Sequence, residues 1–318
     1  MITTLLEISM TKIWMAYGPY FDAIRQTMQT NIAERKHLSV EDVAKKHTFY
    51  MTINSSDKMV RMESVGSNTG QSVNANNPHS FVAILPVCGP ITRNGGACSY
   101  GSIDLRDDMI EAAKQEDCAG VVLYINSGGG SANAIDDIKY AINYVHQQGK
   151  KVKAFIDGMC ASAAYYYAAL CDEIYYMNEK DQIGSIGAFA AFYTQKDGDK
   201  NRYTNETFRV VYADKSYEKN KWYREASEGN YETVKEELNE LNEDFIADVK
   251  AARPNAKDKH LHGAMFNAAD LQGTLVDGQS TLEECCAHMI AIYESNTDNS
   301  TNTKTSINMQ NYPLINAA

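Results

Sequence analysis

Several features that mark common protein classes are missing from this sequence of 318 residues. No apolar run approaches the length that a helix needs to cross a bilayer. Residues 1–15 carry Glu7 and Lys12 and have no basic lead, unlike a secretory signal. Acidic residues outnumber basic ones by 41 to 30, and the net charge of −11 argues against a broad basic surface for nucleic acid. We therefore expect no membrane insertion, no nucleic-acid partner and a cytoplasmic location.

The spacing patterns of disulfide and metal sites are missing too. The seven cysteines are odd in number and form no CxxC pair, which favours free thiols in a reducing compartment. The seven histidines include no HExxH pattern. His260 and His262 are close together, but they lie in a polar loop with no third ligand nearby. We therefore predict no metal site and no cofactor.

Strand-like and helical segments alternate through the middle of the chain. The expected strands, each a largely continuous apolar run, are residues 81–87, 121–126, 152–156, 173–177 and 208–212. The expected helices are residues 103–114, 132–148, 163–170 and 231–252, followed by two shorter helices within 264–292. Alternation of this kind predicts βαβ units and a mostly parallel sheet covered on both faces. The fold class is therefore α/β, with a helical C-terminal part.

The remaining segments give the expected domain boundaries. Apolar residues recur at helical spacing from Ile13 onward, which predicts a helical N-terminal segment over residues 1–52. Residues 53–80 are rich in Asn, Ser and Gly, as in a flexible linker. The main domain then spans residues 81–295. The Asn/Thr/Ser-rich tail, residues 296–318, is expected to be disordered.

Ser162 lies where the strand 152–156 gives way to the helix that begins near Ala163. A helix N-terminus offers free backbone N–H groups and a partial positive charge, which would stabilise an oxyanion. A serine there is also a common helix cap, so position alone leaves both interpretations open. The turn Asn-Ser-Gly-Gly-Gly at residues 126–130 follows the neighbouring strand, and parallel pairing brings both turns to one edge of the sheet. A lysine-rich stretch, residues 214–221, follows a further expected strand.

Five pieces in this order resemble the serine-lysine peptidases related to signal peptide peptidase A and the phage prohead proteases. They are the strand 82–89, the turn 126–130, Ala161–Tyr166, Gly184–Gly187 and a lysine after the strand 208–212. The resemblance covers residues 81–277 and implies the ClpP/crotonase fold. One departure is Gly128, which stands where the family usually has a proline.

The resemblance implies a Ser-Lys dyad. In it, Ser162 is the nucleophile, the backbone N–H groups of Gly129 and Ala163 form the oxyanion hole, and Ser185 hydrogen-bonds to the lysine. A serine hydroxyl needs a base within hydrogen-bond reach, and a lysine amine is a base only in its neutral form.

Two lysines fit the expected position of the base. We prefer Lys219, because the pair Lys219-Asn220 resembles the lysine and polar turn of the family. Lys215 is the fallback.

The function implied is that of a serine endopeptidase, either a phage prohead maturation protease or a soluble relative of signal peptide peptidase A. The substrate would be a polypeptide, such as a scaffold or capsid protein, in the bacterial cytoplasm or within a procapsid. Members of the family form homo-oligomers, and in some of them the serine and the lysine come from neighbouring subunits, so we expect a ring.

The same residues bear on three alternative functions. A Ser-His-Asp triad is disfavoured, because no histidine occurs between His146 and His260. Two alternatives stay open: a crotonase-type CoA-binding enzyme, which would share the glycine turn, and a non-catalytic phage head or scaffold protein with the same fold.

Overall fold

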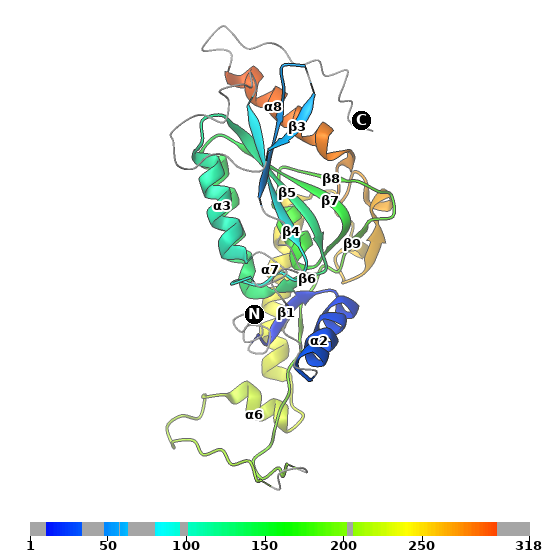
Figure 1. Ribbon diagram of the computed structural model, residues 1–318. Helices are drawn as coiled ribbons and strands as arrows, with labels where there is room; N and C mark the ends of the chain where they lie inside the picture. The colour runs from blue at the N-terminus through cyan, green and yellow to red at the C-terminus, as the bar shows by residue number, and fades with distance from the viewer. Residues whose placement is uncertain are drawn as a thin grey trace.

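A computed structural model describes residues 11–33, 48–56, 58–62, 80–95, 101–201 and 206–297 (Figure 1). The expected disordered tail falls outside these residues from position 298 onward, and so do residues 63–79 of the expected linker. Within the described residues, none of the helices has the length and hydrophobicity required to cross a membrane.

A nine-stranded sheet forms the centre of the molecule. Its main path runs in the order β11-β9-β7-β5-β4-β2-β3, with β8 beside β7 and β12 beside β8. The pairs β4·β5, β5·β7, β7·β8 and β7·β9 are parallel, which confirms the predicted α/β class. The strands are β2 (Phe49–Ile53), β3 (Met59–Met62), β4 (Phe81–Cys88), β5 (Cys118–Ser127), β7 (Lys151–Ala161), β8 (Glu173–Tyr176), β9 (Gln182–Gly184), β11 (Met265–Asn267) and β12 (Gly278–Gln279).

Helices cover both faces of this sheet. One face packs against α3 (Ser102–Lys114), α4 (Ile135–Gln147), α5 (Ala163–Ala169) and α7 (Glu232–Ala252). The other face packs against α8 (Leu282–Thr297). Alternate residues of each central strand point to the two faces, as Ile84 and Leu85 do in β4. The strands are buried on both sides, which explains their continuous apolar runs.

A second, three-stranded sheet lies at the carboxyl ends of the central strands, in the order β10-β1-β6. It consists of β10 (Phe189–Ala190), β1 (Ile13–Ala16) and β6 (Gly129–Ser131). Its middle strand corrects a prediction, because residues 13–16 are not helical. Strands β6 and β10 provide hydrogen-bond partners for the backbone of β1 on both sides. The burial of all four of its residues outweighs any local helical preference. The predicted helix begins only at α2 (Gly18–Ala33).

Three other expectations need correction. Residues 208–212 form no strand: Phe208 exchanges backbone hydrogen bonds with Gly198 and Asp199, the described residues after it do not continue the ladder, and Val211 is 94% exposed. Residues 264–292 hold β11, a 3₁₀ turn (Ala268–Leu271) and β12 before α8, rather than two helices. Strand β3 and the end of β2 lie within the expected linker, where β2 pairs with β4 and β3 pairs with β2.

The segment from residue 191 to residue 230, called the arm below, projects away from the body of the molecule (Figure 1). It carries the short helix α6 (Lys221–Ser227) and rejoins the body at α7. Phe192 and Trp222 pack edge to face at 5.2 Å where the two sides of the arm meet.

Candidate active site

Ser162 joins β7 to α5 in a backbone conformation that serine rarely adopts. Its φ is 54° and its ψ is −118°, a region that favours glycine and costs other residues about 1–3 kcal/mol. The Ser162 N–H donates to the Gly184 carbonyl oxygen at 2.8 Å, and its hydroxyl donates to the Gly187 carbonyl oxygen at 3.2 Å. The hydroxyl makes no capping hydrogen bond to α5. The helix-cap interpretation therefore does not account for this serine, and its strained backbone is of the kind found at functional sites.

Gly129 lies directly beside the start of α5. Its φ is 93°, and a Cβ at this position would stand 3.0 Å from the Ala163 amide nitrogen and 2.8 Å from the Ala161 carbonyl oxygen. The glycine thus lets the backbone of β6 approach the first residue of the helix. In this state the Gly129 N–H donates to the Ser127 hydroxyl at 3.1 Å. The two backbone groups expected to form an oxyanion hole are close together in the fold.

Ser185 lies on the loop that contacts Ser162 from the other side. It follows Gly184 directly, has a φ of 50°, and donates its N–H to the Ala264 carbonyl oxygen at 2.8 Å. Three non-glycine residues in the described ranges have positive φ, and two of them are Ser162 and Ser185. The Ser185 side chain is half-buried, and its hydroxyl has no hydrogen-bond partner in the described part of the chain. It is therefore available to orient another polar group.

The two candidate lysines lie on the arm. Lys215 and Lys219 are both exposed, in the turns that precede α6. The third non-glycine residue with positive φ is Asn220, directly after Lys219. Within the described ranges, no Lys, His, Asp or Glu side chain hydrogen-bonds to Ser162. A single chain therefore brings together Ser162, Gly129, Ala163 and Ser185, and it does not bring either lysine to them.

Two other reactive side chains near the site are held in inert forms. Cys160 is fully buried two residues before Ser162, and burial, followed by the charge of Cys171, raises the pKa of its thiol well above the usual value. Burial and a hydrogen bond to Asp248 raise the pKa of Tyr166 to about 12. Neither group therefore supplies an anion at neutral pH.

The buried histidine of the C-terminal part, His260, makes no hydrogen bond to Ser162 in the described part of the chain. Burial, followed by the charges of Lys259 and Lys257, lowers the pKa of His260. Its ring lies edge to face with Phe266 at 5.2 Å, and its Nδ1 accepts a hydrogen bond from the Lys257 N–H.

Strand β1 is the part of the site that was not predicted from sequence. Its register pairs Ala16 with Gly129, Met15 with Gly130 and Trp14 with Ser131. The Tyr17 N–H continues the ladder by donating to the Gly128 carbonyl oxygen at 2.7 Å. The signal was the continuous apolar run of residues 13–16, which suits a strand buried on both faces as well as it suits a helix.

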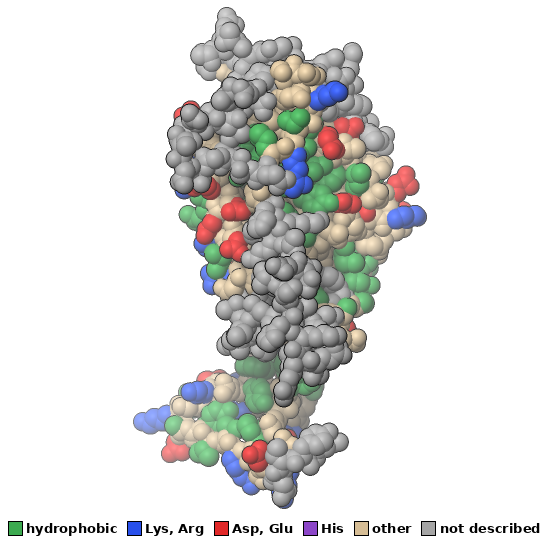
Figure 2. Space-filling view, in the orientation of Figure 1, with side chains coloured by type: hydrophobic (Ala, Val, Ile, Leu, Met, Phe, Trp, Pro, Cys, Tyr) green, Lys and Arg blue, Asp and Glu red, His purple; other side chains and the backbone are tan. Residues whose placement is uncertain are grey.

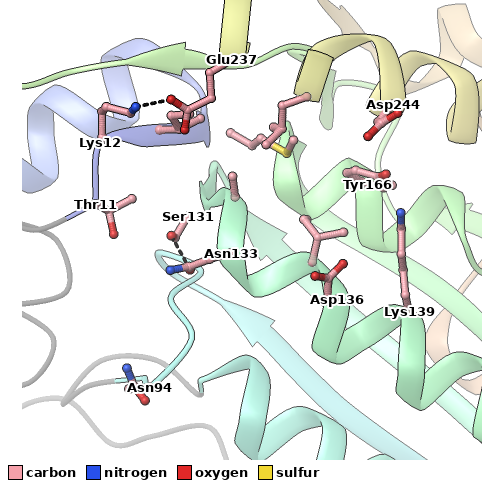
Figure 3. Close-up of a pocket in the computed structure, with 15 residues that line it drawn as sticks. Thr11, Lys12, Asn94, Ser131, Asn133, Asp136, Lys139, Tyr166, Glu237 and Asp244 are labelled. Atoms are coloured by element: carbon pink, nitrogen blue, oxygen red, sulfur yellow. Dashed lines mark hydrogen bonds and ion pairs between the residues drawn. The ribbon is translucent and has the colours of Figure 1, made fainter. Parts of the chain in front are cut away.

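A cleft of about 870 Å³ opens beside β1 (Figure 3). Ile13 and Met15 contribute to one wall, and Tyr166 of α5 contributes to another. Figure 3 shows Lys12 paired with Glu237 of α7 at one side and Lys139 beside Tyr166 at the other. Ser162 is not part of the lining, so the cleft reaches α5 only through Tyr166.

One comparison with known proteins bears on this site. The family model described as Peptidase family S49 matches residues 145–293, a little under half of the chain. The match includes Ser162, Ala163, Ser185 and both lysines, whereas Gly129 lies before it. No curated protein matches the sequence. The match supports, over this part of the chain, the expected relation to the peptidases of family S49.

Proposed function

We propose, from the premise that residues 145–293 are a peptidase family S49 region, that the protein is a serine endopeptidase with a Ser-Lys dyad. Ser162 is the nucleophile, and a lysine of the arm is the base. The observation that carries this proposal is the strained Ser162, buried at the start of α5 beside the backbone of Gly129. Strain, burial and adjacent backbone donors together fit a nucleophile better than a structural serine.

The chemistry follows from these groups. A neutral lysine amine takes the Ser162 hydroxyl proton while the oxygen attacks the peptide carbonyl carbon. The carbonyl oxygen becomes an oxyanion, stabilised by the N–H groups of Gly129 and Ala163; removal of one such donor costs about 2.7–4 kcal/mol. The lysine then gives the proton to the leaving amine, which leaves an acyl group on Ser162. Water, deprotonated by the same lysine, releases the acid and restores the serine.

The base is supplied by the arm of a neighbouring copy in a homo-oligomeric ring. This proposal is supported by the position of Lys215 and Lys219 on a projecting segment, away from Ser162 of the same chain. The arm also exposes large apolar side chains; Tyr193 is 75% exposed, Val211 94% and Tyr217 70%. Figure 2 shows hydrophobic side chains between the charged ones on this part of the surface. Such side chains gain stability when another protein surface covers them. We keep Lys219 as the preferred base and Lys215 as the fallback.

The proposed substrate is a polypeptide, and the proposed setting is maturation of a phage head, where a scaffold or capsid protein is cleaved in the bacterial cytoplasm or inside a procapsid. The order of motifs that resembles the prohead proteases supports this setting.

A fluorophosphonate probe tests the proposed function. It should attach to the full-length protein at one serine, and mass spectrometry of the digest should locate it at Ser162. Ser162→Ala is the matched control and should take up no label. Label at another serine, or none in a protein that also fails to cleave unfolded polypeptides, would favour a non-catalytic head protein with this fold.

A further inference from the structure

The three-stranded sheet has an arrangement that matters for access to Ser162. Its middle strand, β1, comes from the N-terminal segment, and its outer strands, β6 and β10, belong to the site. Strand β6 carries Gly129, and β10 begins two residues after Gly187, which accepts the Ser162 hydroxyl. Adjacent strands lie about 4.8 Å apart, so the space between β6 and β10 holds one extended chain. Strand β1 fills that space.

The register of β1 brings its backbone to the proposed oxyanion hole. Ala16 pairs with Gly129, and a Cβ at Gly129 would collide with the Met15 carbonyl oxygen. The same Cβ position is 3.0 Å from the Ala163 amide nitrogen. A carbonyl of β1 thus lies close to the groups that would hold the carbonyl of a substrate. A peptide attacked by Ser162 has to pass along β6 at this point, and addition of a strand to a sheet edge is a common way for proteins to bind extended peptides.

We propose that β1 occupies the substrate position, so that the N-terminal segment is an intramolecular inhibitor of the peptidase. This inference rests on the proposed function of Ser162. A polypeptide enters when β1 leaves and then pairs with β6 and β10 in its place. Ser162 has no exposed surface while β1 is bound. Departure of β1 also removes Ile13 and Met15 from the wall of the cleft, which then becomes continuous with the strand position and receives a side chain of the substrate.

The contacts of β1 are consistent with a segment that docks and leaves. Trp14 packs against Phe21 of α2 at 4.8 Å, and Phe21 packs against Phe189 of β10 at 5.4 Å. Lys12 pairs with Glu237, whose side chain is 48% exposed, and lies over the Trp222 ring of the arm at 4.5 Å. Because water screens an ion pair whose carboxylate is this exposed, the pair adds little to the binding of β1.

The N-terminal segment also holds the beginning of the arm in place. Arg25 of α2 donates to the Tyr193 hydroxyl at 2.7 Å, and the Ala191 N–H donates to the Lys12 carbonyl oxygen at 3.2 Å. Release of β1 therefore opens the peptide position and loosens the segment that carries the proposed base. Both effects favour cleavage of a substrate.

A disulfide lock on the full-length protein tests the inference. Ile13 of β1 lies opposite Ala190 of β10. Because the adjacent pair Lys12 and Ala191 is hydrogen-bonded, Ile13 and Ala190 form a non-hydrogen-bonded pair, whose side chains are the closer kind. The double variant Ile13→Cys/Ala190→Cys should form a disulfide on mild oxidation, and each single variant serves as its control. Cleavage of fluorescein-labelled casein and fluorophosphonate labelling of Ser162 are then followed before and after reduction.

We expect the oxidised double variant to cleave casein at least ten times more slowly than the reduced form, with a parallel loss of Ser162 labelling. The single variants should not respond to reduction in this way. Equal cleavage and labelling in the oxidised and reduced double variant would overturn the inhibitor role and leave the proposed function intact. Absence of Ser162 labelling in every form would instead refute the proposed function, and the inference with it. Failure of the disulfide to form would contradict the pairing of β1 with β10.

A variant that loosens β1 separates inhibition from support of the fold. Trp14→Ala removes the contact with Phe21 and should raise casein cleavage several-fold, although it lowers the thermal stability. Phe49→Ala is the matched control, because Phe49 is a buried aromatic residue on β2, a strand that does not pair with β1. It should lower stability without raising activity. If Trp14→Ala lowers activity as Phe49→Ala does, β1 is only a structural strand.

Discussion

The hydrogen bond from the Ser162 hydroxyl to the Gly187 carbonyl oxygen, 3.2 Å long, ties the start of α5 to the loop that leads into β10. Because Ser162 also donates its N–H to Gly184, both ends of this loop's first turn are fixed to the same residue. Ser185 lies between these two contacts, which explains how it comes to share the site with Ser162. In the proposed mechanism, a base has to replace this carbonyl as the acceptor of the hydroxyl proton before the serine attacks.

The strain at Ser162 gives a prediction that compares two inactive variants. Ser162→Gly and Ser162→Ala both remove the hydroxyl and should both abolish peptidase activity. Glycine adopts the φ of 54° without penalty, whereas alanine keeps the strain of about 1–3 kcal/mol. Strain relief should exceed the entropic cost of glycine, about 0.5–1 kcal/mol, so Ser162→Gly should be the more stable by about 1 kcal/mol. Urea unfolding of the two variants measures this difference.

The control for this pair is Ala164→Gly, in the first turn of α5. At an ordinary helical position the same loss of a methyl group should destabilise the protein by about 1 kcal/mol. The strain interpretation fails if Ser162→Gly is less stable than Ser162→Ala by a comparable amount.

Gly129 gives a second prediction, because it permits both the approach of β1 and the approach of β6 to α5. In Gly129→Ala the new methyl group would meet the Met15 and Ala161 carbonyl oxygens and the Ala163 amide, all of them backbone atoms. The variant should therefore lose at least 100-fold in kcat, since displacement of the Gly129 N–H removes one of the two proposed oxyanion donors. Steady-state kinetics on a peptide substrate measures the loss. Gly18→Ala, which meets no atom within 4 Å, should keep wild-type activity.

The strands of the central sheet could be predicted from the sequence, because each is marked by a pattern within its own residues. Continuous apolar runs such as residues 121–126 suit strands buried on both faces, and they predicted the positions of β4, β5, β7 and β8. The strand-to-helix turn at Ser162 was found in the same way. Here the pattern of the sequence and the packing of the tertiary structure agree.

Predictions failed where the neighbour of a segment, rather than its own sequence, decides its structure. Residues 13–16 are apolar enough for a helix, and they form a strand because β6 and β10 leave a position between them. Residues 208–212 are apolar enough for a strand, and they form none because the backbone pairing across the arm stops at Phe208 in the described residues. Pairing across more than a hundred residues, such as that of β1 with β6, leaves no local signal.

A third prediction concerns the pH dependence of stability through Asp172. Burial raises the pKa of this carboxyl, but hydrogen bonds from Lys151, from the Val152 N–H at 2.8 Å and from His146 outweigh burial and hold the pKa below its usual value. The carboxylate therefore stabilises the fold above the unfolded-state pKa of about 3.9, and this contribution is lost as the pH falls through the lower folded-state pKa.

The corresponding variant is Asp172→Asn, which should lower the free energy of unfolding by about 1–3 kcal/mol at pH 7, the range for hydrogen bonds to a charged group. The difference from the wild type should shrink as the pH is lowered below about 4. Urea unfolding at pH 7 and at pH 3 measures both values. Glu236→Gln, an exposed carboxylate on α7, should change stability little at either pH. A constant difference between Asp172→Asn and the wild type at both pH values would contradict the proposed role of the charge.

The last prediction addresses the origin of the base. Lys219→Ala should be as inactive as Ser162→Ala, because a nucleophile and its base act as one unit, whereas Lys215→Ala should be mild. In wild-type protein, activity should rise with pH, since only a neutral amine accepts the serine proton.

If the lysine reaches Ser162 of a neighbouring copy, a mixture of inactive Ser162→Ala and Lys219→Ala subunits should regain activity. At equal amounts, about one quarter of random interfaces would pair an intact serine with an intact lysine, so up to about a quarter of wild-type activity is expected. Each variant alone, at the same total concentration, is the control. A mixture that stays inactive after dissociation and reassembly would mean that the serine and its base come from one chain. Activity lost in Lys215→Ala and kept in Lys219→Ala would instead assign the base to Lys215.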